Sequence, residues 1–168
     1  LLGLSEWREA QRTDHAEQLE DQRVEHAEQL EDQRAERADK RALQQTLYVA
    51  KLDGIGMPGE DLSHLSFGGR SLIGAILAEA DLTGADLLNA NLTGAVLFGA
   101  DLSGANLGQA DLTGADLGWA NLTGTNLSEA NLTGAKLDRS NLTDADMVDA
   151  NLTDANLTLT DLTGTVLI

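Results

Sequence analysis

From Leu62 to Leu167, every fifth residue of the chain is large and apolar. Of these 22 positions, 20 are Leu, and the other two are Phe67 and Met147. From Ala75 onward a small residue, usually Ala, precedes each of them by two positions, and no residue is inserted or lost. A period of five matches neither the roughly 3.6 residues of a helical turn nor the period of about 2 of a strand. An ordinary amphipathic helix or strand is therefore excluded.

The spacing within each unit indicates how the chain runs. The small and the large residue are two positions apart, so in extended backbone both side chains point to the same side. A chain that turns a corner after each five-residue unit, with these side chains inward, builds a solenoid. We therefore expect the leucines to fill a shared core and the alanines to fit beside them.

The repeated unit is Ala-Asp/Asn-Leu-x-x, as in "ADLTGADLGWANLTG" over residues 110–124. It resembles the repeat of the pentapeptide-repeat family over residues 60–168. The resemblance implies an all-β solenoid, a right-handed quadrilateral β-helix with four pentapeptides per coil. The 109 residues would then form about five and a half coils.

With four sides per coil, one opposite pair of sides is uniform in sequence and the other pair varies. The residue before the central Leu is Asp or Asn at 15 of 17 positions from Asp81 to Asp161, and the exceptions are Val96 and Lys136. Both fall on one side, together with most of the atypical turn residues. Trp and Arg are frequent anchors of interfaces. The candidate partner contacts are Ile76, Val96, Phe98, Trp119, Lys136, Arg139 and Leu159.

Two alternatives remain for this side. The N-terminal segment could pack over Ile76, Val96 and Phe98, or the solenoid could simply tolerate the atypical residues.

The N-terminal segment has its own repeat, since "DHAEQLEDQR" at 14–23 returns as "EHAEQLEDQR" at 25–34. A period of eleven residues is typical of a helix with about 3.67 residues per turn. It predicts a self-associating coiled coil. The two alternatives are a lone charged stalk and a helix that lies along the solenoid. The open last coil is a second candidate for self-association. The oligomerisation candidates are Ala16, Leu19, Val24, Ala27 and Leu30 on the helix, and Leu162 and Leu167 in the last coil.

These patterns predict three regions. Residues 1–53 form a charged helical segment, residues 54–59 a Gly/Pro linker and N-terminal cap, and residues 60–168 the β-helix. The chain begins at Leu1 rather than Met, which indicates that a tag, a signal or a membrane segment precedes it.

The charge of the chain constrains its partners. The formal net charge is −17, with 8 basic and 13 acidic residues in 1–57 and 3 basic and 15 acidic residues in 58–168. This balance argues against direct binding to nucleic acid or to an anionic membrane surface. No apolar run is long enough to span a bilayer.

No pattern indicates catalysis. There is no phosphate-binding loop, no readable nucleophile set and no Cys, and His15 and His26 lie too far apart on a helix to share a metal. We therefore expect no enzymatic activity, no cofactor and no metal.

The preferred function is a protein-interaction scaffold, a rigid acidic rod on an oligomerising or tethering helix. The family resemblance implies one alternative, a DNA mimic that binds DNA gyrase or another topoisomerase. A third reading is the soluble part of a membrane-tethered protein. We expect a bacterial, cytoplasmic protein, tethered to a membrane only through a segment upstream of Leu1.

Overall fold

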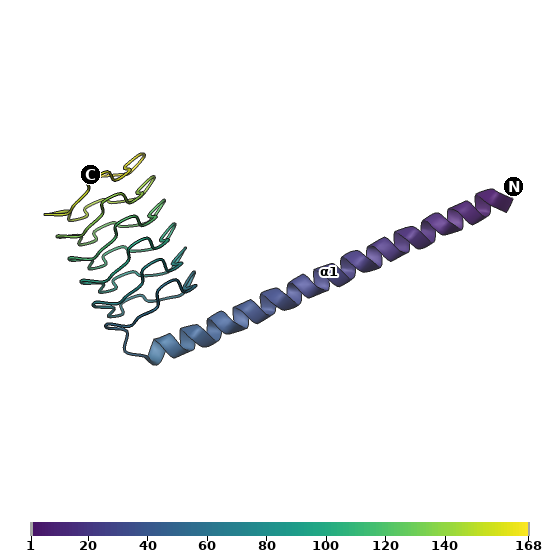
Figure 1. Ribbon diagram of the computed structural model, residues 1–168, viewed down its shortest axis with the longest axis horizontal. Coiled ribbons are helices and arrows are strands. Elements are labelled where there is room, and N and C mark those ends of the chain that lie inside the picture. The colour runs from purple at the N-terminus through teal and green to yellow at the C-terminus, as the bar shows by residue number, and fades with distance from the viewer. Residues whose placement is uncertain (1, 168) are drawn as a thin grey trace. The chain divides into compact units, whose positions relative to one another are not determined.

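The structure is a computed structural model that describes residues 2–167, with side chains described for residue 3, residues 21–48 and residues 50–167. The chain divides into two compact units, Leu1–Leu43 and Gln44–Ile168. The first unit contains most of a single long helix, α1, which runs from Leu2 to Val49 (Figure 1).

Over residues 21–39, helix α1 exposes its apolar side chains to solvent. Val24 is 50% exposed and Leu30 39% exposed, and Ala27 is exposed as well. Lys40 forms an ion pair with Glu36 one turn earlier, at 3.9 Å, of the kind that modestly supports an exposed helix. The side chains of Ala16 and Leu19 lie outside the described residues.

The second unit is a stack of turns that ascends from the end of α1 to the C-terminus (Figure 1). Four ladders of parallel β-bridges hold it together, and each bridge joins residues 20 positions apart, as in Asp61↔Asp81, Ser66↔Asp86, Ser71↔Asn91 and Ile76↔Val96. Every bridge is a single residue wide, so residues 2–167 contain no extended strand. The chain turns after each five-residue unit, which leaves no length for one.

The repeated leucines form the core. Leu112, in a middle coil, has no exposed surface, and the repeat positions from Leu62 to Met147 are all buried. Each buried Leu contributes about 1.5–3 kcal/mol relative to an exposed one. Exposure rises in the last described coil, where Leu162 is 39% and Leu167 51% exposed. No later coil of the described chain covers them.

The first ladder begins before residue 60, where the sequence places the start of the β-helix. Gly56 pairs with Ile76 in a parallel bridge, so the Gly/Pro segment at 54–59 already belongs to the ladder. Two backbone hydrogen bonds form this bridge. The N–H of Ile76 donates to the carbonyl of Ile55, and the N–H of Met57 donates to the carbonyl of Ile76.

The last turns of α1 cap this first coil. Leu47 and Leu52 are buried, whereas the ring of Tyr48 is exposed. Arg70 donates from Nη1 to the carbonyl of Tyr48 and from Nη2 to the carbonyl of Ala50, at 2.7 Å each.

Gln44 makes the most specific contact of this cap. Its Nε2 donates to the carbonyl of Ser66 at 2.9 Å, and its Oε1 accepts the N–H of Ser66 at 2.7 Å. One coil later, the equivalent groups of Asp86 bond with backbone of the preceding coil, at Leu65 and Phe67. The amide of Gln44 therefore takes the place of a missing rung.

Candidate functional site

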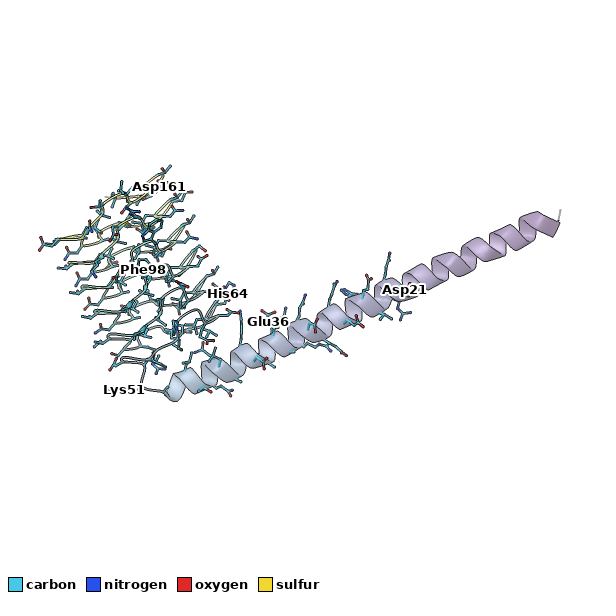
Figure 2. All side chains as sticks on the ribbon, in the orientation of Figure 1. Asp21, Glu36, Lys51, His64, Phe98 and Asp161 are labelled. Atoms are coloured by element: carbon cyan, nitrogen blue, oxygen red, sulfur yellow. The ribbon has the colours of Figure 1, made fainter. Side chains whose placement is uncertain are left out.

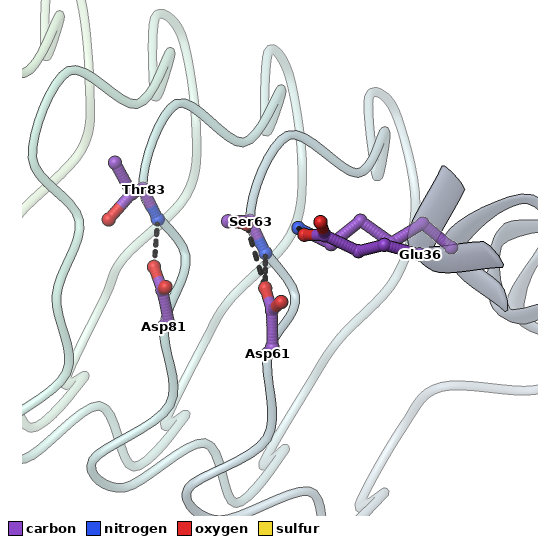
Figure 3. A network of polar contacts seen from close by, with 6 residues as sticks. Glu36, Asp61, Ser63, Asp81 and Thr83 are labelled. Atoms are coloured by element: carbon purple, nitrogen blue, oxygen red, sulfur yellow. Dashed lines mark hydrogen bonds and ion pairs between the residues drawn. The ribbon is translucent and has the colours of Figure 1, made fainter. Parts of the chain in front are cut away.

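The uniform sides of the solenoid use their polar side chains in turns. The Oδ1 of Asp61 accepts the N–H of Ser63 at 3.0 Å, and one coil later Asp81 accepts the N–H of Thr83 at 2.9 Å (Figure 3). Short polar side chains bonded to backbone two residues ahead stabilise tight turns. These carboxylates therefore have a structural role.

Asn side chains link successive coils. The Nδ2 of Asn121 donates to Oδ1 of Asp101 at 3.1 Å, and that of Asn126 donates to Oδ1 of Asn106 at 3.0 Å. An ionised Asp only accepts hydrogen bonds, so an Asn one coil later supplies the donor. Similar bonds occur in the fourth column, where Asp116 accepts the N–H of Gly118 and Asn156 accepts the N–H of Thr158, so most polar groups of all four outward columns are used within the solenoid.

Two acids in these columns, Asp101 and Asp111, are stabilised as carboxylates. Burial alone would raise the pKa of Asp101, but hydrogen bonds from Ser103 and Asn121 outweigh it, so this pKa lies below its ordinary value. The hydroxyl of Thr113 is the main cause that lowers the pKa of Asp111. The exterior of these sides therefore stays negative at neutral pH.

One ladder departs from this pattern, and the structure places in it Ile76, Val96, Asp116, Lys136 and Asn156. We call this ladder and its following turns the variable flank; its atypical turn residues are Phe98, Trp119, Arg139 and Leu159. All seven candidate contact residues thus lie on one side of the solenoid. Phe98, which is labelled in Figure 2, is 44% exposed. Ile76 is 46% exposed.

Phe98 lies against the backbone of the next coil. A Cβ built on Gly118 would be 3.3 Å from the ring of Phe98, so glycine leaves the space that the ring needs. Leu88 and Gly108 form a similar pair on another side, with a distance of 3.2 Å to the built Cβ. Sequence reasoning missed both pairs, although a bulky residue and a Gly 20 positions apart are the signal.

Trp119 and Arg139 form a cation–π pair. The guanidinium carbon of Arg139 lies 4.9 Å from the centroid of the Trp119 ring, and Trp119 is 55% exposed. Within residues 58–168, Arg70 is engaged by backbone carbonyls and Lys136 by Asp116, at 3.0 Å. Among the described residues, none accepts a hydrogen bond from the guanidinium of Arg139.

Bulky turn residues on this flank have strained backbone. The φ angles are 60° at Trp119, 61° at Arg139 and 61° at Leu159, whose side chain is 71% exposed. This left-handed region favours Gly, Asn and Asp, and Gly114 occupies it on a neighbouring side with φ 65°. Gln109 and Glu129 on the opposite side have the same left-handed conformation, so this strain is not specific to the variable flank. The sequence gives no direct signal of it.

The oligomerisation candidates of the last coil are also exposed. Leu167 lines an open hollow together with Met147 and Ala150. Neither a cluster of three or more potential metal ligands nor a helix able to cross a membrane is found in the described part of the chain.

The fold and this surface define a class of protein, a β-solenoid with a 20-residue repeat and one atypical flank. The family model described as Pentapeptide repeats matches in 8 copies, over residues 61–97, 90–128 and 125–164. The chain therefore belongs to the pentapeptide-repeat family, whose members form right-handed β-helices. A comparison with curated proteins finds no match.

Several solved structures are similar. Rfr23 from the cyanobacterium Cyanothece 51142 is 29% identical, with 70% of this chain and 87% of that chain covered and a TM-score of 0.44. The pentapeptide-repeat protein alr5209 from Nostoc Pcc 7120 is 38% identical, with 65% and 85% covered and a TM-score of 0.44. QnrB1, a plasmid-mediated fluoroquinolone resistance protein, is 23% identical, with 67% and 62% covered and a TM-score of 0.30.

Proposed function

We propose that this protein is a non-enzymatic protein-interaction scaffold whose variable flank contacts the partner. In this proposal the solenoid is a four-sided acidic rod of about five and a half coils, from 109 residues at 20 per coil. Helix α1 oligomerises or tethers the rod. The observation that carries the proposal is the exposed Trp119–Arg139 pair at two strained turns.

The distribution of unused binding groups supports this assignment. Throughout the solenoid, most Asp and Asn side chains bond to turns or to an adjacent coil, as Asn131 does with Thr113 at 2.9 Å. The variable flank in addition exposes Phe98, Trp119 and Leu159, whose side chains make no such bonds to any described residue. Exposed aromatic residues beside an Arg have the composition of interface anchors.

The test replaces the anchor without disturbing the turn. Glycine is compatible with the left-handed backbone, so Trp119→Gly and Arg139→Gly should leave the solenoid folded. The matched controls are Gln109→Gly and Glu129→Gly, which occupy the same kind of turn on the opposite side with φ angles of 56° and 57°. We expect pull-downs from the native cells to lose the partner only with the first two variants. A partner retained by Trp119→Gly and Arg139→Gly contradicts the proposal.

The acidic exterior favours a second candidate, a DNA mimic that binds DNA gyrase. Addition of the purified protein to a supercoiling assay should then change gyrase activity or its sensitivity to quinolones. An unchanged reaction at a large molar excess eliminates this candidate. The membrane-tethered alternative is tested separately, by sequencing the codons upstream of Leu1.

A further inference from the structure

We infer that the variable flank binds an acidic segment of the partner protein, with a carboxylate on Arg139 and apolar side chains on both sides of it. The inference rests on the proposed function, because it names the chemistry of the contact that the proposed function requires. Three observations carry it. No described residue accepts a hydrogen bond from the Arg139 guanidinium, the other two basic residues of 58–168 already have partners, and exposed apolar groups lie one coil after and two coils before Arg139.

Arg139 is held ready for an anion. Its guanidinium carbon lies over the ring of Trp119 at 4.9 Å, and both residues have left-handed backbone. A cation–π contact does not use up the N–H donors of the guanidinium. These donors match the two oxygens of a carboxylate, and no described residue occupies them.

The solenoid as a whole disfavours an acid, and Arg139 is the exception, although Asp116 and Asp138 lie on the same flank. Residues 58–168 contain 15 acidic and 3 basic residues, so most of the rod repels a carboxylate. Of the three basic residues, Lys136 already pairs with Asp116 at 3.0 Å and Arg70 holds the cap. An acidic residue of a partner therefore has one favourable position, which also fixes the register of the contact.

Apolar groups lie along the flank on both sides of Arg139. Leu159 occupies the same turn position one coil later and is 71% exposed, and Phe98 lies toward the N-terminal end and is 44% exposed. Coils are about 4.8 Å apart, and alternate residues of an extended peptide are roughly 6.6 Å apart. Along the axis Leu159 therefore lies one coil, about 4.8 Å, after Arg139, and Phe98 two coils, about 9.6 Å, before it. In a peptide with apolar residues two positions before and after its acid, each apolar side chain has to span a difference of about 2–3 Å to reach these two groups.

The experiment uses the full chain with Trp7→Phe, so that Trp119 is the single reporter. The probe is the peptide acetyl-Leu-Thr-Glu-Thr-Leu-amide, and the matched peptide has Gln in place of Glu. Binding is followed by Trp119 fluorescence and by the ¹⁵N–¹H signal of its indole. We expect the Glu peptide to bind about tenfold more tightly than the Gln peptide, as for loss of a charge-assisted bond. Arg139→Gly should remove this difference, and the control Glu129→Gly should keep it.

Three results would overturn the inference. They are equal binding of the two peptides, no response to the Glu peptide at millimolar concentration, and inorganic phosphate binding at least as tightly as the Glu peptide. None of these refutes the proposed function, which depends on the pull-down variants. Conversely, a partner retained by Arg139→Gly would refute the proposed function even if the peptides behaved as expected.

Discussion

The cap at the N-terminal end of the solenoid leads to a quantitative prediction about one side chain. Gln44 replaces a missing rung of the ladder, because its amide both donates to and accepts from the backbone of Ser66. Gln44→Ala removes both hydrogen bonds at once. The backbone N–H and carbonyl of Ser66 then depend on water.

The magnitude follows from the number and exposure of these bonds. A typical hydrogen bond contributes about 0.5–1.5 kcal/mol net, and this site is solvent-exposed, so water recovers part of that value. We therefore expect Gln44→Ala to lower the free energy of opening at Ser66 by about 1–2 kcal/mol, which is a factor of roughly 5–30 in amide protection. Hydrogen exchange followed by NMR measures this protection directly.

The control is Gln45→Ala, an exposed neighbour on the same helix. It should leave Ser66 protection unchanged and alter global stability by less than about 0.5 kcal/mol. In Gln44→Ala the loss should concentrate at the first coil, while amides such as that of Leu112 keep their protection. Equal protection of Ser66 in the two variants would refute the role of Gln44 as a surrogate rung.

Three further predictions concern the core, the carboxylates and the helix. Leu112→Ala should cost about 2–5 kcal/mol in urea unfolding and Leu112→Asp should prevent folding, whereas Leu167→Ala, half exposed, should cost far less; equal costs contradict the core assignment. The hydroxyl of Thr113 holds the pKa of Asp111 below its ordinary value. The ionised Asp111 therefore adds its full stabilisation of the folded state above the unfolded pKa of about 4, and this contribution is lost as the pH falls through the folded pKa. The urea midpoint should fall at acid pH, and less so in Asp111→Asn. Leu30→Glu should dissociate any oligomer seen by sedimentation; a wild-type monomer at high concentration removes the coiled-coil prediction.

The repeat itself could be predicted from the sequence, and the family match confirms it. The reason is physical, because one buried position every five residues fits neither a helix nor a strand and requires a chain that turns after each unit. The column that contains Ile76, Val96 and Lys136 follows from the 20-residue coil that the family resemblance implies, and the bridges join these residues in one ladder. Whether this ladder contacts a partner stays a prediction.

Other features required coordinates. The bond between Gln44 and Ser66 depends on where the last helical turn meets the first coil, and no repeat fixes that junction. The bridge between Gly56 and Ile76 was not predicted, because residues 54–59 were interpreted as a Gly/Pro linker and N-terminal cap. The cation–π pair depends on side-chain rotamers, and the φ of 61° at Leu159 is invisible in a sequence in which most such turns have Gly, Asn or Asp.

Three departures on the variable flank are paired with a residue of an adjacent coil. Lys136 contacts Asp116, Arg139 lies over Trp119, and Phe98 lies against Gly118, each pair being 20 positions apart. Similar pairs lie on the opposite side, Leu88 with Gly108 and Gln109 with Glu129, so pairing alone does not separate partner contact from simple tolerance. What distinguishes the variable flank is that its pairs order two aromatic side chains, Phe98 and Trp119, and leave them exposed. Such pre-ordering lowers the entropy lost when a partner binds, which is what an interface anchor requires.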